Sequence, residues 1–476
     1  MVLKYIWEIL LALLIGGTAF VIVVDKGDPG RKLAWLLVIA FLPVLGLFLY
    51  FCFGVNFRHH WIFRQRHMRY RDAFLAGSDE HLNKLLFRIA EPERLPERYQ
   101  PLARVLASGS HLQPTDDNEL EIITKGSWKF CLLLEDLRAA KTSIHMEYFH
   151  FGNDAGSRAI KEVLMQKARE GVEVRFINEN IANFPIPSLY YDDMKKAGVE
   201  VQKFTNPRSH LLNWVTLLNY RDHRKIVVID GKIGYTGGMN INDKYFLHWR
   251  DTHLRITGKA VYSLQYLFLD TWLVSGGSLP RPVRDYFPET EKHDGKLVHV
   301  VPASPQEENP VLQLGYEWVL QHAQKYIWLQ TPYFVPPEPV LDAMKSAAIG
   351  GTDVRIMLPA KSDNFYMRLA NRLYFKELLE AGVKIYLRGG EFMHCKTFVC
   401  DDDLCSVGTA NLDYRSFSIN CEVNTYVYDR ETALQCKEIF LKDLELCEQV
   451  SLAAVQTGRW HHRIGEGIIG LFAPLL

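Results

Sequence analysis

Two short groups of polar residues in this chain share the same order and spacing. In each group a histidine and a lysine are two residues apart, and an aspartate follows the lysine after four residues. They are His223, Lys225 and Asp230 in the first group and His394, Lys396 and Asp401 in the second. An imidazole can attack an electrophile or move a proton near neutral pH, and an ammonium group can hold negative charge beside it. The duplication predicts one site built from two similar halves.

The residues downstream of the two groups match as well. A glycine lies 14 residues after each histidine, an asparagine 17 after it and an acidic residue 28 after it. These matched positions are Gly237 and Gly408, Asn240 and Asn411, and Asp251 and Glu422. One short motif can match by chance, whereas two motifs with the same flanking offsets identify an internal repeat.

Each histidine–lysine pair is expected at the start of a β-strand. Residues 226–229 and 397–400 are apolar and β-branched or aromatic for the most part, and turn residues follow them. Side chains two apart on a strand point to the same face, so the imidazole and the ammonium group lie side by side. For one copy, an ordinary solvated strand face would explain the pattern equally well. The second copy favours a site.

Similar segments recur around the two motifs. Residues 171–176 resemble 351–356, and 197–201 resemble 381–385. Strand-like and helix-like stretches alternate, which predicts an α/β fold of two similar halves, each a mostly parallel sheet flanked by helices. The first half carries an extra apolar segment, residues 204–219. We expect this segment either to pack on the core, to line a lipid-binding mouth or to touch a bilayer.

The chain divides into six predicted parts. They are a transmembrane hairpin (1–57), a basic juxtamembrane and helical segment (58–120), the first half (121–274, motif 223–240), a linker (275–294), the second half (295–455, motif 394–411) and an apolar C-terminal segment (456–476). The C-terminal segment is too short to span a membrane, and either a core helix or an interfacial helix fits its composition.

The N-terminal hairpin is expected to cross a membrane twice. Residues 5–24 and 33–57 are apolar and long enough to span, and Pro43 and Gly46 mark a kink or close helix packing in the second span. Three basic residues lie in the connecting loop and six lie near the outer ends of the spans. This bias places the catalytic part in the cytoplasm. The arginines of residues 58–71 serve as a topology signal or also attract anionic lipid.

Composition narrows the functional classes to which the protein could belong. The formal net charge is zero, which disfavours a dedicated nucleic-acid binder. The eight cysteines show neither a disulfide framework nor zinc-ligand spacing, so no metal and no cofactor are expected.

The double motif resembles that of the phospholipase D superfamily. The two N-terminal spans, the run at residues 331–336 (TPYFVP) and the apolar C-terminus resemble its bacterial cardiolipin synthase branch. The likeness covers essentially the whole chain. The family often has serine after the motif glycine, where this chain has Gly238 and Thr409. Gly238 offers a backbone donor alone, whereas Thr409 retains a hydroxyl.

The resemblance implies a mechanism without metal. Lys225 and Lys396 would neutralise a phosphodiester, helped by neutral donors from Asn240, Asn411 and Thr409. His223 would be the nucleophile and His394 the general acid and base. Asp251 and Glu422 would orient the imidazoles, while Asp230 and Asp401 belong to the catalytic motifs as orienting, polar-network residues.

The same resemblance implies the substrates and the location. One phosphatidylglycerol would donate its phosphatidyl group and a second would accept it, giving cardiolipin and glycerol at the bacterial cytoplasmic membrane, among anionic lipids. Nothing in the sequence fixes an oligomeric state. The alternatives are a membrane-bound phospholipase D that uses water as acceptor, a catalytically silent scaffold that binds anionic lipid and, less favoured, a nuclease.

Overall fold

The computed structural model describes most of the chain. Its described residues are 2–25, 29–54, 74, 80–87, 94–204, 220–290, 295–305, 307 and 309–456. Three predictions therefore lie outside the described residues. They concern the arginines of residues 58–71, nearly all of the extra segment at 204–219 and the C-terminal segment from residue 457 onward.

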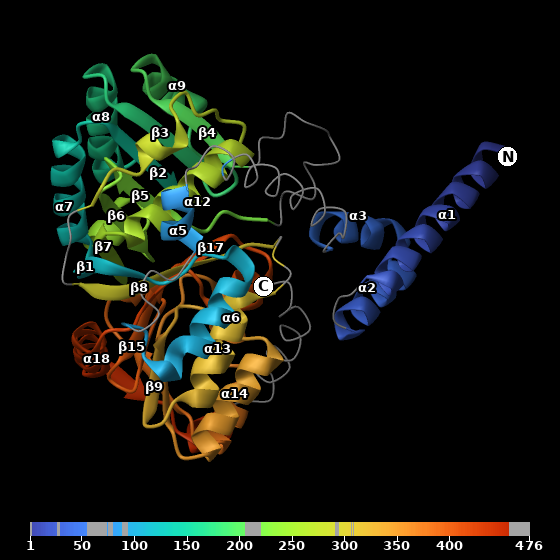
Figure 1. Cartoon of the computed structure of the whole chain (residues 1–476). Helices are drawn as coiled ribbons and strands as arrows, with labels where there is room; N and C mark the ends of the chain where they lie inside the picture. The colour runs from blue at the N-terminus through green and yellow to red at the C-terminus, as the bar shows by residue number, and fades with distance from the viewer. Residues whose placement is uncertain are drawn as a thin grey trace.

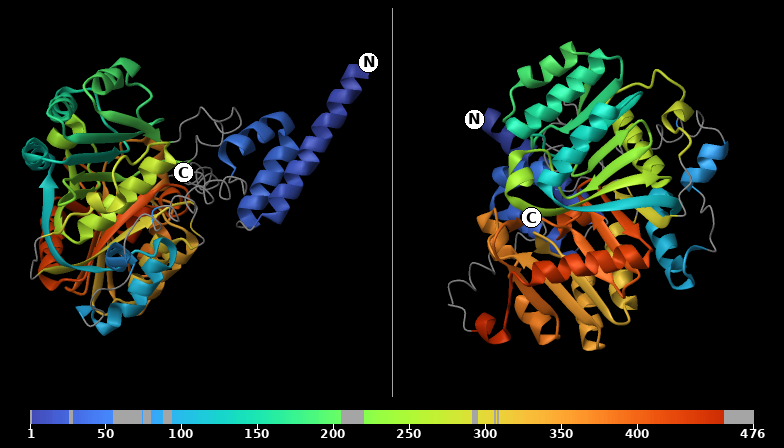
Figure 2. Two further views of the ribbon diagram at one scale, coloured as in Figure 1. Left: turned by 45° about the horizontal axis from the view of Figure 1, so that its top comes forward. Right: turned by 90° about the vertical axis from the view of Figure 1, so that its left-hand side faces the viewer.

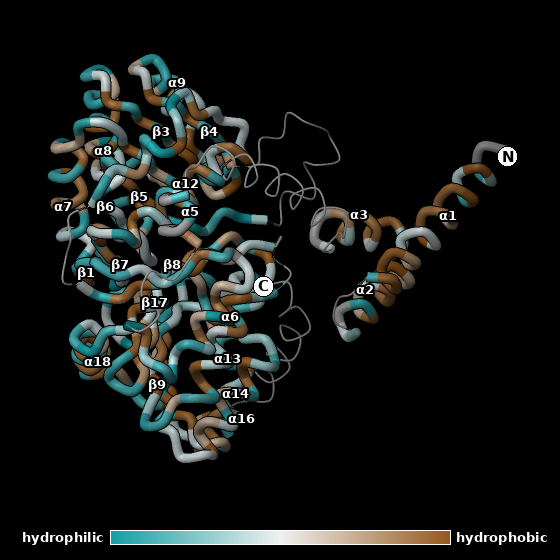
Figure 3. The backbone as a smooth tube through the Cα atoms, in the orientation of Figure 1, coloured by the Kyte–Doolittle hydropathy of each residue, from teal (hydrophilic) through white to brown (hydrophobic). Residues whose placement is uncertain are grey.

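Three apolar helices begin the chain and lie apart from the main body in Figure 1. They are α1 (Val2–Val24), α2 (Pro29–Phe41) and α3 (Pro43–Phe53). Most of their length is hydrophobic (Figure 3). Among the described residues, α1 is the one helix long and apolar enough to cross a membrane.

The second predicted span is divided into α2 and α3 rather than continuous. Pro43 begins α3 directly after Leu42, and proline has no backbone N–H to continue the preceding helix. Gly46 lies against the backbone of α2, where an added Cβ would come within 2.7 Å of the Val38 carbonyl oxygen. The expected kink at Pro43 and close packing at Gly46 are both present, and the second predicted span consists of two shorter helices.

One mixed sheet runs through the main body (Figures 1 and 2). Within the described residues its strands lie in the following order: β18 (Cys447–Gln449), β12 (Lys384–Arg388), β11 (Asp353–Pro359), β9 (Tyr326–Gln330), β14 (Thr397–Cys400), β15 (Leu404–Gly408), β17 (Glu422–Val427), β8 (Lys296–Ala303), β1 (Thr115–Lys125), β7 (Trp249–Gly258), β6 (Ile233–Gly237), β5 (Lys225–Ile229), β2 (Ser143–Tyr148), β3 (Glu173–Glu179) and β4 (Glu200–Phe204). The short strand β13 (Phe392–Met393) pairs with β7, and β10 (Phe334–Val335) pairs with β16 (Leu412–Asp413).

The order of strands is the same from either side of the β1–β8 junction. Reading outward, β1-β7-β6-β5-β2-β3-β4 matches β8-β17-β15-β14-β9-β11-β12. The two similar halves and the α/β class are therefore confirmed. The predicted strand direction needs correction, because only the outer strands of each half run parallel. The motif strands β5 and β14 lie antiparallel to both neighbours, since each is joined to the next strand by a tight turn instead of a helix.

Helices cover both faces of the sheet. The main ones are α7 (Gly126–Ala139), α8 (Ala155–Arg169), α9 (Ser188–Lys196), α12 (Ala260–Val274), α13 (Val311–His322), α14 (Glu338–Ile349), α16 (Phe375–Glu380) and α18 (Arg430–Leu444). Shorter ones are α5 (Glu80–Phe87), η2 (Glu97–Tyr99), α6 (Gln100–Ser110), α11 (Asp243–Leu247), η4 (Val283–Tyr286), α15 (Phe365–Ala370), α17 (Tyr414–Ser418) and α19 (Leu452–Gln456).

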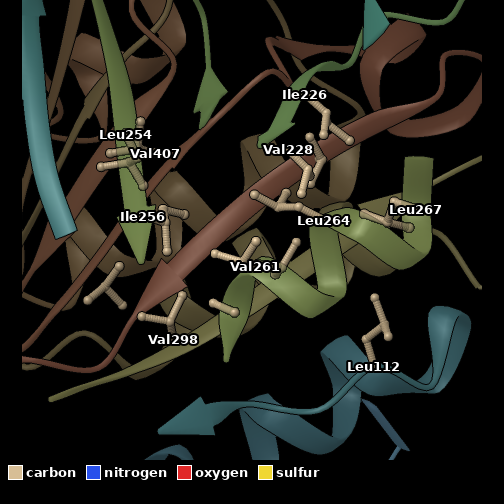
Figure 4. Close-up of a cluster of buried hydrophobic side chains, with 14 of the residues drawn as sticks. Leu112, Ile226, Val228, Leu254, Ile256, Val261, Leu264, Leu267, Val298 and Val407 are labelled. Atoms are coloured by element: carbon tan, nitrogen blue, oxygen red, sulfur yellow. The ribbon is translucent and has the colours of Figure 1, made fainter. Parts of the chain in front are cut away.

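The motif strand β5 is buried on both faces. Ile226 and Val228 pack in a central cluster with α12, whereas Val227 and Ile229 pack in the cluster of the first half. Figure 4 shows the central cluster, in which α12 residues such as Val261 and Leu264 meet the sheet. A helix buried nearly all round, as α12 is, holds the two halves together, so the motif strands start from fixed positions.

The predicted domain boundaries can be placed on this fold. The boundary at residue 120 falls inside β1, which begins at Thr115. The predicted linker at 275–294 contains η4, with Tyr286 buried. The six-part division itself stays a prediction.

Candidate active site

Each motif histidine lies just before its strand and is tied to the other half by its backbone. The His223 N–H donates to the Cys421 carbonyl oxygen at 2.9 Å, and the His394 N–H donates to the Arg250 carbonyl oxygen at 2.8 Å. Cys421 directly precedes Glu422, and Arg250 directly precedes Asp251. The crossover therefore brings each histidine next to the acidic residue of the opposite half.

The side chains pair in the same crossed way. His223 Nδ1 lies 2.9 and 3.0 Å from the two carboxylate oxygens of Glu422, and His394 Nδ1 lies 2.8 Å from Asp251 Oδ2. Both carboxylates are fully buried. A carboxylate at Nδ1 takes the Nδ1–H, which leaves Nε2 of the neutral ring with a free lone pair. The two acids that their common offset predicted thus contact the imidazoles. Each acid contacts the histidine of the opposite half.

The motif lysines lie buried beneath the histidines. Lys225 Nζ donates to the His223 carbonyl oxygen at 2.6 Å, and Lys396 Nζ donates to the His394 carbonyl oxygen at 2.6 Å. Lys396 Nζ also lies 3.1 Å from His394 Nε2. Each ammonium group is consequently held next to its own imidazole, as their shared strand face predicts.

Burial shifts the titration of all four groups. It lowers the pKa of His223 to about 4 and that of His394 to about 3, so both rings are neutral at physiological pH. Burial also lowers the pKa of Lys225 to about 7 and that of Lys396 to about 8, against the attraction of the nearby carboxylates. A bound phosphodiester anion would favour the charged forms of the lysines and of one imidazole.

Both histidines line one cavity of about 600 Å³. Asn240 and Asn411 line it too. Asn240 Nδ2 donates to the Tyr245 hydroxyl at 2.8 Å, and its Oδ1 accepts from the His150 N–H. Asn411 Oδ1 is buried and has no hydrogen-bond partner among the described residues. The asparagines therefore border the space where a phosphodiester would lie.

Thr409 differs from its expected role. Its hydroxyl donates to Glu422 Oε2 at 2.6 Å instead of facing the cavity as a phosphate donor. The matching residue Gly238 leaves room for the other carboxylate, since an added Cβ would lie 2.2 Å from Asp251 Oδ1. Both positions after the motif glycine thus adjoin a carboxylate that holds an imidazole.

Asp230 and Asp401 lie at the far ends of the motif strands and are not among the residues that line the cavity. The Asp230 carboxylate accepts the backbone N–H groups of residues 141–143, and the Asp401 carboxylate accepts those of residues 324–326. Arg98 also donates to Asp401 at 2.7 Å. These bonds fix the starts of β2 and β9, in keeping with polar-network residues, and the assignment of both aspartates to the catalytic motifs stays a prediction.

Several cavity residues escaped the sequence reasoning. Arg221, Lys244, Trp249, Arg415 and Asn420 all line the cavity. Lys244 matches Arg415 and Trp249 matches Asn420 in the repeat, so the repeat itself could have located these four. Their residue types differ between the halves, and a search for identical residues at equal offsets passes over them.

Two known protein families match parts of this chain. Residues 133–272 and 318–444, more than half of the chain, match the family described as cardiolipin synthase, PLD-like domain. The chain belongs to the cardiolipin synthase family of phospholipase D-like proteins. Residues 12–54 match the family described as phospholipase D-nuclease N-terminal. The first match falls on the two halves and the second on the apolar N-terminal helices.

Curated relatives of this cardiolipin synthase family extend over nearly the whole chain. Cardiolipin synthase 2 of Bacillus anthracis is 37% identical over 467 residues, which is 96% of this chain and 89% of the relative. Major cardiolipin synthase ClsA of Bacillus subtilis is 34% identical over 484 residues, which is 100% of this chain and 98% of the relative.

A solved structure shares the fold of the main body. The phosphatidylserine synthase of Haemophilus influenzae matches with a TM-score of 0.58 at 16% identity, over 74% of this chain and 92% of that chain. This likeness supports the two-half architecture of the cardiolipin synthase family member described here. The apolar helix α1 and the N-terminal family match further indicate association with a membrane.

Proposed function

We propose that this chain is a cardiolipin synthase that joins two phosphatidylglycerol molecules and releases glycerol. The observation that carries the proposal is the pair of buried histidines at one cavity, each held at Nδ1 by a carboxylate of the opposite half. Two imidazoles held at Nδ1 and two lysines beneath them match the needs of transfer between phosphodiesters through a covalent intermediate.

In the first step the neutral His223 attacks the phosphorus of the donor through Nε2. A nitrogen–phosphorus bond forms and the bond to the glycerol oxygen breaks. Positive charge grows on the imidazole, and Glu422 stabilises it through Nδ1. The bound phosphate raises the affinity of His394 for a proton, so this ring takes one from solvent and gives it to the departing oxygen. Lys225 and Lys396 stabilise the added negative charge on the phosphoryl oxygens.

In the second step the acceptor takes the place of the released glycerol. His394 removes the proton from the terminal hydroxyl of a second phosphatidylglycerol, while Asp251 stabilises the imidazolium that forms. The hydroxyl oxygen bonds to phosphorus and the bond to His223 breaks, which regenerates neutral His223 and leaves His394 protonated, as it was before the first proton transfer. Over the two steps the products are cardiolipin and glycerol, and the enzyme is unchanged.

Membrane placement follows from the N-terminal segment. We place it in the bacterial cytoplasmic membrane as a two-span hairpin, with the catalytic halves on the cytoplasmic side. The apolar character of α1 to α3 and the excess of basic residues beyond their outer ends support this arrangement. Cysteine labelling from either side of sealed vesicles, at a residue introduced between α1 and α2, tests it.

Product analysis tests the activity. Purified full-length protein is incubated with phosphatidylglycerol in mixed micelles, and the products are identified by mass spectrometry. Cardiolipin with glycerol in equal amounts supports the proposal. Phosphatidic acid with glycerol would identify a phospholipase D that uses water, and the absence of any product would indicate a lipid-binding scaffold. Both of these results would overturn the proposed transferase.

A further inference from the structure

The two ends of the cavity differ in chemistry although they occupy matched positions of the repeat. Two residues before each histidine stand Arg221 and Phe392, and 26 residues after it stand Trp249 and Asn420. Because the halves cross, the residue 26 positions after one histidine lies beside the other histidine. Each end of the cavity is therefore built from both halves.

The end at His394 is aromatic. The Trp249 ring centroid lies 4.7 Å from that of Phe392 and 5.5 Å from that of His394. Tyr245 adds a third ring, 5.3 Å from His394. Lys244, which directly precedes Tyr245 and stands 21 residues after the first motif histidine, also lines the cavity.

The end at His223 has one aromatic ring, Phe149, 4.8 Å from His223, and its other groups are basic and polar. Arg221 directly precedes the Asp222–His223 pair, and Arg415 stands 21 residues after His394, at the position matching Lys244. Asn420 donates to Glu422, the carboxylate partner of His223, at 3.2 Å. The Arg415 carbonyl oxygen accepts the N–H groups of residues 419 and 420, which anchors this arginine next to the carboxylate.

Arg221 and Arg415 both line the cavity. Burial lowers the pKa of the Arg415 guanidinium, Asp413 opposes this, and the charge of Arg221 lowers the pKa further. Arg221 Nη1 lies 3.6 Å from Glu179, while its Nε is buried without a hydrogen-bond partner among the described residues. Two like charges at one end of a cavity cost free energy that a bound anion offsets.

Cardiolipin formation brings two phosphodiesters into the same cavity. The negative charge of the reacting phosphodiester is neutralised by Lys225 and Lys396, one from each motif. The acceptor carries a second phosphodiester, three carbons away from the hydroxyl that reacts, and this phosphate needs cations of its own. Guanidinium groups suit it, since their paired N–H donors fit two phosphate oxygens at once.

We propose that Arg221 and Arg415 form a second phosphate subsite, which binds the unreacting phosphodiester of the acceptor phosphatidylglycerol. This inference rests on the proposed function. The subsite selects an acceptor with a phosphate over water or a simple alcohol, and so directs the covalent intermediate toward cardiolipin. Arg221 and Arg415 are binding residues in this scheme and take no part in bond breaking.

Competition between acceptors tests the subsite. Full-length enzyme receives phosphatidylglycerol as donor together with ethanol and glycerophosphoglycerol, which is the headgroup of the acceptor without acyl chains. Mass spectrometry gives the ratio of the phosphatidyl-glycerophosphoglycerol product to phosphatidylethanol. Both products arise from one intermediate, so their ratio is independent of the first step. Arg221→Gln and Arg415→Gln should each lower this ratio at least about tenfold.

Matched variants control for position and charge. Lys244→Gln, at the position equivalent to Arg415, should lower the ratio less than about threefold, and Arg415→Lys should restore part of the loss. Equal ratios in the parent and the arginine variants would overturn the subsite, as would a loss in Lys244→Gln as large as that in Arg415→Gln. A loss seen with phosphatidylglycerol but absent with glycerophosphoglycerol would assign the pair to the bilayer surface instead. If the parent enzyme makes neither phosphatidyl product, the proposed function itself fails.

Discussion

Replacement of Glu422 by glutamine tests the crossed pairing of imidazole and carboxylate. The carboxylate accepts from His223 Nδ1 at 2.9 and 3.0 Å, from Thr409 at 2.6 Å and from Asn420 at 3.2 Å. Glutamine keeps the size of the side chain but has one oxygen, so it cannot satisfy all three donors. When its NH₂ group faces His223, the imidazole must carry its proton on Nε2, and the lone pair required for attack is lost.

The expected loss can be estimated from this geometry. A hydrogen bond to a charged group contributes about 1.5–3 kcal/mol, which corresponds to roughly 10- to 150-fold in rate. Inversion of the tautomer adds to this, and the equivalent acid-to-amide change in a serine protease triad lowers kcat about 10⁴-fold. We therefore expect Glu422→Gln to lower the rate of intermediate formation by about 10²- to 10⁴-fold.

A donor with an activated leaving group distinguishes the effects of the two carboxylates on the first step. A phosphatidyl donor with a p-nitrophenol leaving group needs no proton from His394, because p-nitrophenolate departs unaided. In a rapid-mixing assay that follows the nitrophenolate burst, Asp251→Asn should regain most of the first step with this donor. Glu422→Gln should remain slow, because the fault lies in the nucleophile.

Pairing within one half would give the opposite pattern, with Asp251→Asn slow and Glu422→Gln restored by the activated donor. That result would refute the crossed geometry, and equal recovery of both variants would refute the assigned roles. Glu431→Gln serves as the control for loss of an acid, since Glu431 is an exposed partner of Lys296. It should behave as the parent does with either donor.

Three further predictions concern titration, cooperation and metals. Burial lowers the pKa of Lys225 to about 7 and that of Lys396 to about 8. Because the lysines act as cations, kcat/KM should fall as pH rises through about 7 to 9, and a level profile up to pH 10 in micelle assays would contradict this. His223→Ala and His394→Ala should each abolish turnover, and the double variant should be scarcely slower; parent-like turnover in either single variant would exclude a shared site. Turnover should survive prolonged chelation, whereas a loss reversed by one divalent ion would show that a metal takes part.

Much of the site could be predicted because the repeat fixes it twice. The common offset of 28 residues located Asp251 and Glu422, and the strand pattern placed each lysine beside its histidine. The same offset cannot tell which histidine each acid serves, because both pairings fit it equally. The choice depends on the contacts of Cys421 and Arg250 across the halves, which only the folded chain contains.

Other differences have local physical causes. Hydropathy predicted one second span with a kink or close packing at Pro43 and Gly46, and the backbone of Pro43 ends the preceding helix there. The motif pattern predicted a polar-network role for Asp230 and Asp401 but not the partners of their carboxylates. Each carboxylate accepts three backbone N–H groups at the start of a neighbouring strand, a need that spacing alone does not reveal. Strand direction likewise depended on the tight turns that follow β5 and β14.

The crossed pairing also bears on how such a chain could arise. A single half holds a histidine, a lysine and an acid, but its acid lies beside the histidine of the other half. An ancestor with one half would therefore have been active only as a homodimer, with its two-fold axis passing between two identical active-site ends. Duplication of that gene and fusion of the two copies would remove the requirement that both halves have the same sequence. Each end could then change without altering the other, so that arginines gathered at His223 while aromatic rings surrounded His394.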